Sequence, residues 1–123
     1  MDLNVITGQI VDSAMRVHSA LGPGLLESTY QTCLVYELCE CGLAVESEVP
    51  LPVIYRGIKL NAGYRIDLLV ASSVIVEVKA IEKLLPLHRA QLLAYLKLSG
   101  KQLGLLLNFN VSSLKDGIVR MAN

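Results

Sequence analysis

Two carboxylates and one ammonium group lie close together in the middle of the sequence, at a spacing that could support metal chemistry. Asp67 lies in the apolar run IDLLV, and Glu77 and Lys79 lie in the run VIVEVKA that follows it. Side chains alternate between the two faces of a strand, so Glu77 and Lys79 are expected to share one face. In the preceding strand, the same alternation predicts that Arg65, Asp67 and Leu69 share a face. Because the link between these strands is short, we expect Asp67 and Glu77 to lie near each other.

Charged groups in such apolar strands are costly to bury unless partners neutralise them. A divalent cation is one possible partner, since oxygen ligands suit Mg²⁺ or Mn²⁺. With a cation held by Asp67 and Glu77, Lys79 could hold a water molecule or a phosphate, and the cation could acidify that water. The alternative is a structural salt bridge of either carboxylate with Lys79 or Arg65, because Glu-x-Lys tripeptides are common.

Helical periodicity dominates the first third of the chain. Apolar residues recur at helical spacing from Ile6 to Leu21 and predict an amphipathic helix. The run Gly22-Pro23-Gly24 ends it, because proline lacks an N–H group and glycine tolerates left-handed geometry. A second helix is predicted from about Leu26 to Cys41, with Gly42 after its end.

The middle and the end of the chain contain the expected strands. Residues 44–55 include Pro50 and Pro52, which suit an edge strand or a bulge, and Arg56-Gly57 makes a turn. Further strands are predicted at 64–70, 74–80, 103–109 and 117–121, and a third helix begins at Pro86 and ends at Gly100. The order α-α-β-β-β-α-β-β predicts an α/β fold with a mixed central sheet flanked by helices, in a single domain over residues 1–123.

The composition limits the location and the assembly of the protein. Hydrophobic residues make up 53% of the 123 residues, so a second copy could cover part of the apolar surface. No apolar run approaches the ~20 residues needed to cross a bilayer, and the N-terminus lacks the basic region of a secretory signal. We therefore expect a cytoplasmic protein without a membrane partner. Its three cysteines, Cys33, Cys39 and Cys41, are expected to be free, buried or half-buried thiols.

Charge is balanced overall but divided along the chain. The formal net charge is zero, which argues against nonspecific coating of nucleic acid. Before Pro50 the only lysine or arginine is Arg16, whereas lysine and arginine outnumber the acidic residues after Leu51. This asymmetry could form one basic face, in which Arg89 and Lys97 are candidate nucleic-acid contacts, or could reflect ordinary solvated charges.

Further motifs accompany the central carboxylates. The chain contains Gly24-Leu-Leu-Glu27-Ser-Thr-Tyr30, then Asp67 with Glu77-Val78-Lys79, then Gln91-Leu-Leu-Ala-Tyr95. Each motif alone is weak, but the ordered set resembles the GxxExxY family of the PD-(D/E)XK nuclease superfamily from about Ile6 to Phe109. The resemblance implies a restriction-endonuclease-like αβββαβ core with an extra N-terminal helix.

The same resemblance implies roles for individual residues. A metal would be held by Asp67, Glu77 and the carbonyl of Val78, with Glu27 reaching in from a helix. Glu27 could instead only stabilise the first turn of that helix, where the macrodipole favours a carboxylate.

Gln91 and Tyr95 lie one helical turn apart and could point at the same spot. We expect Gln91 to position a phosphate and Tyr95 to support it, although a plain polar stripe is the alternative. His18 is expected in or beside the core, and His88 is either a phosphate contact or solvated.

Two classes of function follow. The first is a magnesium- or manganese-dependent phosphodiesterase acting on DNA in preference to RNA, with Glu27, Asp67, Glu77, Lys79, Gln91 and Tyr95 at the site. The second is a binding or regulatory module that keeps the nuclease fold without cleaving, because the small chain leaves little room for substrate recognition. A homodimer, or a partner protein that supplies DNA binding, is a further possibility.

Overall fold

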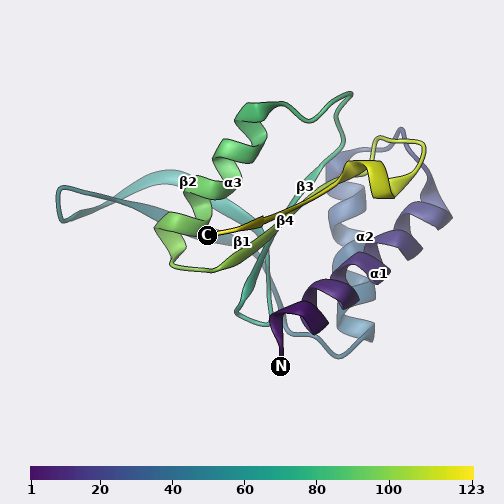
Figure 1. The fold of residues 1–123 in the computed structure, drawn as a ribbon, viewed down its shortest axis with the longest axis horizontal. Helices are drawn as coiled ribbons and strands as arrows, with labels where there is room; N and C mark the ends of the chain where they lie inside the picture. Colours follow the sequence, from purple (N-terminus) through teal and green to yellow (C-terminus); the bar gives the residue numbers. More distant parts are fainter.

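A five-stranded mixed sheet forms the centre of the computed structural model, which describes residues 1–123 (Figure 1). The strands β3 and β4 are parallel, and every other neighbouring pair is antiparallel. This confirms the expected α/β class with a mixed sheet. In spatial order the strands are β1 (Val45–Tyr55), β2 (Ile58–Val70), β3 (Val74–Lys79), β4 (Leu103–Asn108) and β5 (Ile118–Ala122).

Helices cover both faces of the sheet (Figure 1). The helices α1 (Leu3–Leu21) and α2 (Glu27–Glu40) pack on one face, and α3 (Pro86–Ser99) packs on the other. The strand β3 divides its side chains between them, since Val76 and Val78 belong to the core under α1 and α2 while Ile75 belongs to the core under α3. A short 3₁₀ helix, η1 (Leu114–Gly117), precedes β5.

Local signals at the helix ends explain where these elements begin and stop. The Asp2 carboxylate accepts a hydrogen bond from the Asn4 N–H group at 2.7 Å and caps α1. Pro86 occupies the first turn of α3, where its missing N–H group has no helical partner to lose. Gly100, with φ at 72°, ends α3 in the left-handed conformation. Both ends of α3 agree with the expected boundaries within one residue, whereas α1 begins three residues before Ile6, where its apolar periodicity starts.

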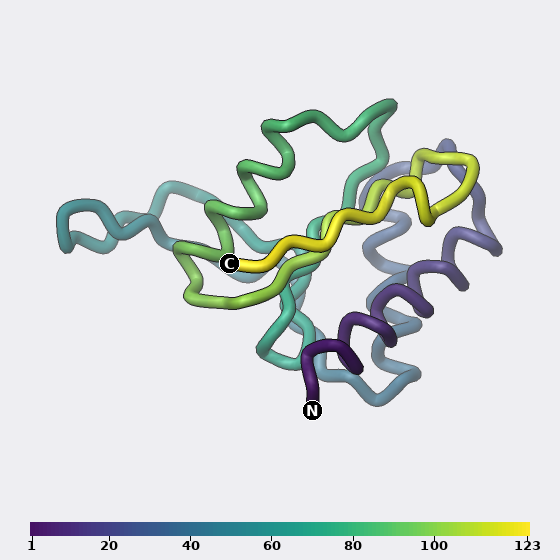
Figure 2. The backbone as a smooth tube through the Cα atoms, viewed as in Figure 1, coloured from purple at the N-terminus to yellow at the C-terminus, as the bar shows by residue number.

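The hairpin of β1 and β2 extends beyond the rest of the sheet (Figures 1 and 2). The strand β2 begins at Ile58, six residues earlier than the expected start at Tyr64. Those extra residues are exposed on both faces of the hairpin. Because neither face is buried, burial does not require apolar and polar residues to alternate there, and a burial pattern could not be used to predict the strand. We call the segment Val53–Tyr64 the β1–β2 arm. Its base contains a register shift between Leu51 and Val53, so the expected edge strand and bulge are both present.

The strand β2 does not keep strict alternation. Ile66 and Leu69 are three residues apart, yet both pack in the core under α3. The interruption coincides with Glu48 on β1, whose φ of 53° departs from extended geometry. Arg65 therefore lies on the opposite face from Ile66, and the expectation that Arg65, Asp67 and Leu69 share one face is wrong for Arg65.

The cysteines are free, as expected, but only Cys33 is half-buried. Cys39 and Cys41 are exposed because they lie on the last turn and at the end of α2, so their expected burial is wrong. None of the helices combines the length and the apolar character that crossing a membrane requires.

Candidate metal centre

Asp67 and Glu77 face each other where the strands β2 and β3 separate. Regular pairing between these strands ends at Leu68 and Val76. Beyond that point, the Asp67 N–H group donates to Glu77 Oε2 at 2.8 Å, and the Val78 N–H group donates to Asp67 Oδ2 at 2.8 Å. Side-chain oxygens thus replace the backbone ladder, and the two carboxylates are held between the strands.

Neither carboxylate has a cationic partner. The ion pair in this structure joins Arg16 to Glu37, on α1 and α2, and no Lys or Arg nitrogen lies within ion-pair distance of Asp67 or Glu77. The alternative of a structural salt bridge is therefore not formed.

Burial and mutual repulsion act together on these two acids. Glu77 is only 4% exposed, and burial, followed by the charge of Asp67, raises its pKa to about 8. Burial also raises the pKa of Asp67, although the hydrogen bond from Val78 opposes the shift. The charge of Lys79 lowers both pKa values without cancelling these shifts, so Glu77 keeps its proton at neutral pH in the metal-free protein.

Glu27 approaches the same strand from α2. It is the first residue of that helix, and its Oε2 atom accepts a hydrogen bond from the Ala80 N–H group at 3.3 Å. Ala80 directly follows Lys79 at the end of β3. Glu27 thus lies in the first helical turn and also reaches the end of β3, so the two roles considered from sequence are compatible in geometry.

Tyr30 fixes the loop that presents Glu27. Its hydroxyl donates to the Gly22 carbonyl at 2.5 Å and accepts from the Leu25 N–H group at 3.1 Å. Its ring stacks on Phe109, with centroids 4.7 Å apart. Gly24 has a φ of 102° in this loop, which few side-chain-bearing residues adopt. The spacing of glycine, glutamate and tyrosine therefore has a structural meaning: two residues shape the loop and the third reaches the site.

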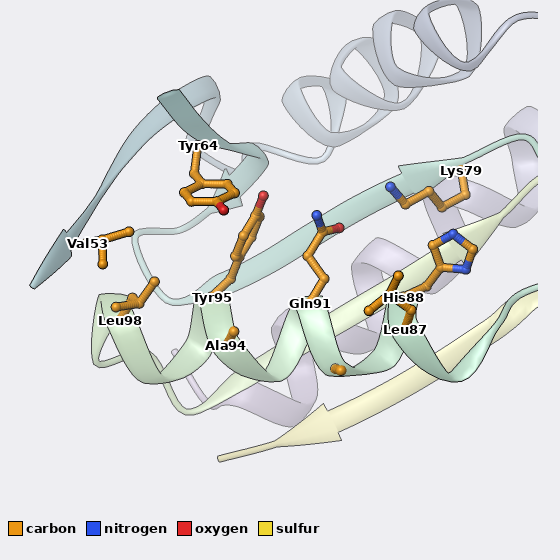
Figure 3. Close-up of a pocket in the computed structure, with 10 residues that line it drawn as sticks. Val53, Tyr64, Lys79, Leu87, His88, Gln91, Ala94, Tyr95 and Leu98 are labelled. Atoms are coloured by element: carbon orange, nitrogen blue, oxygen red, sulfur yellow. The ribbon is translucent and has the colours of Figure 1, made fainter. Parts of the chain in front are cut away.

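Lys79 lines a cavity of about 670 Å³ between the sheet and α3. Gln91 and Tyr95 project from the same face of α3 into this cavity, on the side of the strand that carries Lys79 (Figure 3). The Tyr95 ring meets Tyr64 edge-on, at a centroid distance of 6.1 Å. Burial, with a smaller contribution from the charges of Glu77 and Asp67, raises the pKa of Tyr95. The predicted pairing of Gln91 and Tyr95 on one face is confirmed.

The candidate nucleic-acid contacts on α3 lie away from this cavity. Arg89 lines a separate hollow with Lys83 and Asp116, and Lys97 is exposed and does not line the cavity. His88 does line the cavity, and its Nδ1 accepts from the Leu85 N–H group at 2.9 Å. His18 is buried and bonded to the carbonyl of Val111, as expected of a histidine in the core.

Two supporting residues were not identified from the sequence. Gln31 donates to the Asp67 carbonyl at 3.3 Å and to Glu48 Oε1 at 3.1 Å, so it links α2 to both strands where they are irregular. Buried Asn108 at the end of β4 bonds both backbone groups of Ile81 and steadies the segment that follows β3. Gln31 lies four residues after Glu27, and this shared helix face was the available signal.

The donor set suits a hard divalent cation, although the donors are not yet gathered around one point. Carboxylate oxygens from Glu27, Asp67 and Glu77 are ligands that Mg²⁺ and Mn²⁺ accept. However, no three acidic, histidine or cysteine side chains come together closely enough in this structure to hold a metal ion. Each carboxylate instead accepts a hydrogen bond from a backbone N–H group, so binding would require the side chains to rotate.

Comparison with known proteins agrees with the chain-wide pattern. The sequence matches the model of the PD-(D/E)XK nuclease superfamily over residues 4–121. No curated protein and no solved structure matches it. The matched segment includes the order α2-β1-β2-β3-α3-β4, which is the restriction-endonuclease-like core, with α1 as the additional N-terminal helix.

Proposed function

The chain belongs to the PD-(D/E)XK nuclease superfamily, and from this premise we propose that it hydrolyses phosphodiester bonds of DNA with Mg²⁺ or Mn²⁺ as cofactor. The observation that carries the proposal is the pair of half-buried Asp67 and buried Glu77, held between separating strands without an ion pair to Lys or Arg. Two adjacent acids that cannot both ionise at neutral pH weaken the fold, whereas a cation between them would remove their repulsion. The finer assignment to the GxxExxY family is supported by the placement of Gly24, Glu27 and Tyr30.

In this proposal, Asp67, Glu77 and the carbonyl of Val78 hold the cation, and Glu27 contributes from α2. When bound, a divalent cation offsets the negative charge that grows on the phosphate and lowers the pKa of water. The hydrogen bonds of Asp67 and Glu77 to the backbone keep both carboxylates in the gap between the strands, from which they would turn to reach the cation.

The chain's own residues then position the substrate. The Lys79 ammonium group binds a non-bridging oxygen of the scissile phosphate, or the attacking water, at the edge of the cavity. The Gln91 amide donates to the same phosphate, and Tyr95 supports it from the next helical turn. Buried Leu92 and Leu96 anchor α3 to the sheet and hold these side chains toward the strand that carries Lys79.

The test is a cleavage assay on single-stranded, duplex and branched DNA with Mg²⁺ or Mn²⁺. Cleavage is expected to stop with a chelator and to fall by orders of magnitude in Glu77→Gln and in Lys79→Ala. Exposed Glu46→Gln and Lys115→Ala serve as charge-matched controls and should cleave normally. Cleavage that survives both site substitutions would indicate another site or a contaminating nuclease.

One observation favours a second candidate, a binding module that keeps the fold without cleaving. The three carboxylates do not converge into a ready ligand group. Absence of cleavage on every substrate, together with retained binding of DNA, would favour this alternative over hydrolysis.

A further inference from the structure

The β1–β2 arm exposes apolar side chains to an unusual extent. Tyr55 and Ile58 are each 61% exposed, Ile54 is 52% exposed and Leu60 is 45% exposed. Figures 1 and 2 show the arm extending away from the helices, with no element covering its tip. Adjacent apolar side chains exposed in this way indicate a contact surface.

The charged residues of the arm are all basic. It carries Arg56 and Lys59, with Arg65 just beyond its base, and no acidic residue occurs between Glu48 and Asp67. None of the three cations is in an ion pair. A partner that meets both the apolar and the charged groups must therefore be anionic and must also offer apolar contacts.

The turn at the end of the arm places a cation at its extreme tip. Arg56 and Gly57 join Tyr55 to Ile58 and have φ values of 51° and 78°. Two successive positive φ values are typical of a type I′ hairpin turn, whose first position favours asparagine, aspartate or glycine. Arginine at that position accepts backbone strain that asparagine would relieve. Replacing Arg56 with asparagine therefore removes the charge without weakening the turn.

The arm begins at the rim of the candidate site. Val53 and Tyr64, the two ends of the arm, line the cavity that contains Lys79 (Figure 3). A polymer with one phosphate at Lys79 would therefore continue past the base of the arm. The arm is thus placed to contact the same molecule outside the reacting bond.

We propose that the β1–β2 arm enters a groove of duplex DNA and supplies substrate binding for the hydrolysis proposed above, on which this inference rests. The major groove admits a two-stranded β ribbon. Ribbons and arms of this chemistry place cations on phosphates and apolar side chains against the bases. Association of two arms around a twofold axis fits less well, because it would bring Arg56, Lys59 and Arg65 of both copies together without a carboxylate to neutralise them.

The experiment measures binding of the full chain to a short fluorescein-labelled DNA duplex by anisotropy, in chelator, over a range of salt concentrations. Arg56→Asn and Lys59→Gln are each expected to weaken binding roughly tenfold, as loss of a charge-assisted hydrogen bond implies. Each should also reduce the slope of log K against log salt by about 0.9. Arg56→Asn should melt no lower than wild type, because asparagine suits the turn, so weaker binding cannot be attributed to unfolding.

Lys115→Gln is the matched control, since η1 lies at the opposite end of the molecule from the arm (Figure 1). It should leave affinity and slope unchanged. The inference is overturned if the wild type does not bind the duplex, if single strands bind more tightly than the duplex, or if both arm variants bind like the wild type. Arm variants that dissociate a dimer in light scattering, without altering DNA binding, would assign the arm to a second copy and also overturn it.

Hydrolysis of bis(p-nitrophenyl) phosphate tests the chemistry separately, because this small diester has no duplex groove for the arm to enter. Loss of that activity in Glu77→Gln, with full activity in Arg56→Asn, is expected. A wild type that hydrolyses neither the diester nor DNA would count against the proposed function, while the binding result would still decide for or against the arm.

Discussion

The backbone N–H group of Asp67 donates to Glu77 Oε2 at 2.8 Å, so the two acids of the candidate site are joined through backbone and side chain. Asp67 in turn accepts from the N–H group of Val78, the residue after Glu77. Each carboxylate is therefore fixed by the strand that carries the other. Each acid therefore accepts a backbone hydrogen bond and can also carry a charge, and suitable substitutions can remove one property without the other.

Asp67→Asn and Asp67→Ala should have different effects on stability. Asparagine keeps an oxygen for the Val78 N–H group and removes a charge that repels Glu77, so the metal-free protein should be as stable as wild type or more so. Alanine leaves the Val78 N–H group without its acceptor and should cost ~1–3 kcal/mol. Urea unfolding in chelator measures both. A loss of ~3–5 kcal/mol in Asp67→Asn would instead mean that Asp67 neutralises a buried cation.

The stability of the metal-free protein should fall as pH rises. The pKa of Glu77 is about 8 in the folded chain against an ordinary value of 4.5. The folded state therefore binds the proton more tightly than the unfolded state does. This contribution is complete below about pH 4.5 and is lost as pH rises through about 8. The raised pKa of Asp67 acts in the same direction.

Unfolding free energies at several pH values in chelator test this expectation, and Glu77→Gln should show a flatter profile than wild type. Glu46→Gln, which removes an exposed carboxylate, should follow the wild-type profile. A Glu77→Gln profile as steep as that of wild type would assign the pH dependence to other groups.

Metal should stabilise the wild type and scarcely affect Asp67→Asn. A ligand that binds only the folded state contributes RT ln(1 + [L]/Kd), about 2.7 kcal/mol at a hundredfold excess over Kd. Because the cation must displace the proton of Glu77, its affinity should also increase with pH up to about 8. Thermal melts with manganese and with chelator measure both effects. A wild type indifferent to manganese at pH 8 would contradict the assignment of the metal ligands.

Sequence patterns predicted much of this arrangement because the relevant constraints are local. Alternation within β3 and the short link Ala71–Ser73 were enough to expect Asp67 near Glu77. The interruption at Glu48 and Asp67 could not be predicted, since it depends on pairing between two strands that both lose regularity there. Gln31 was missed for a related reason: its partner is the backbone carbonyl of Asp67, and a carbonyl has no sequence signature.

Activity should depend on the cavity face of α3 and not on its other faces. Gln91→Ala should lower kcat by about 100- to 1000-fold if its amide positions the phosphate, by analogy with other groups that stabilise charge in the reacting state. Lys97→Ala should leave kcat unchanged, because Lys97 does not line the cavity. Steady-state cleavage of one DNA substrate by each variant provides the comparison. Equal losses in both variants would indicate a general effect on α3.

Tyr30→Phe should show how much the loop that presents Glu27 contributes to cation binding. Phenylalanine keeps the stacking on Phe109 but leaves the Gly22 carbonyl and the Leu25 N–H group without the hydroxyl that joins them. Because the loop is largely exposed, the cost in stability should be modest, about 1 kcal/mol. Cation affinity should fall more than stability does. Without the hydroxyl the loop is more mobile, so Glu27 is held less firmly at the end of β3.

Calorimetric titration with manganese measures that affinity, with Glu27→Gln as the reference for complete loss of the carboxylate. Tyr30→Phe should lie between wild type and Glu27→Gln, and Tyr36→Phe, at an exposed position on the same helix, should match the wild type. If Glu27→Gln itself binds manganese as tightly as wild type, Glu27 is only a residue of the first helical turn, and the loop has no part in the metal centre. If Glu27→Gln binds weakly while Tyr30→Phe binds normally, Glu27 reaches the cation without help from the tyrosine.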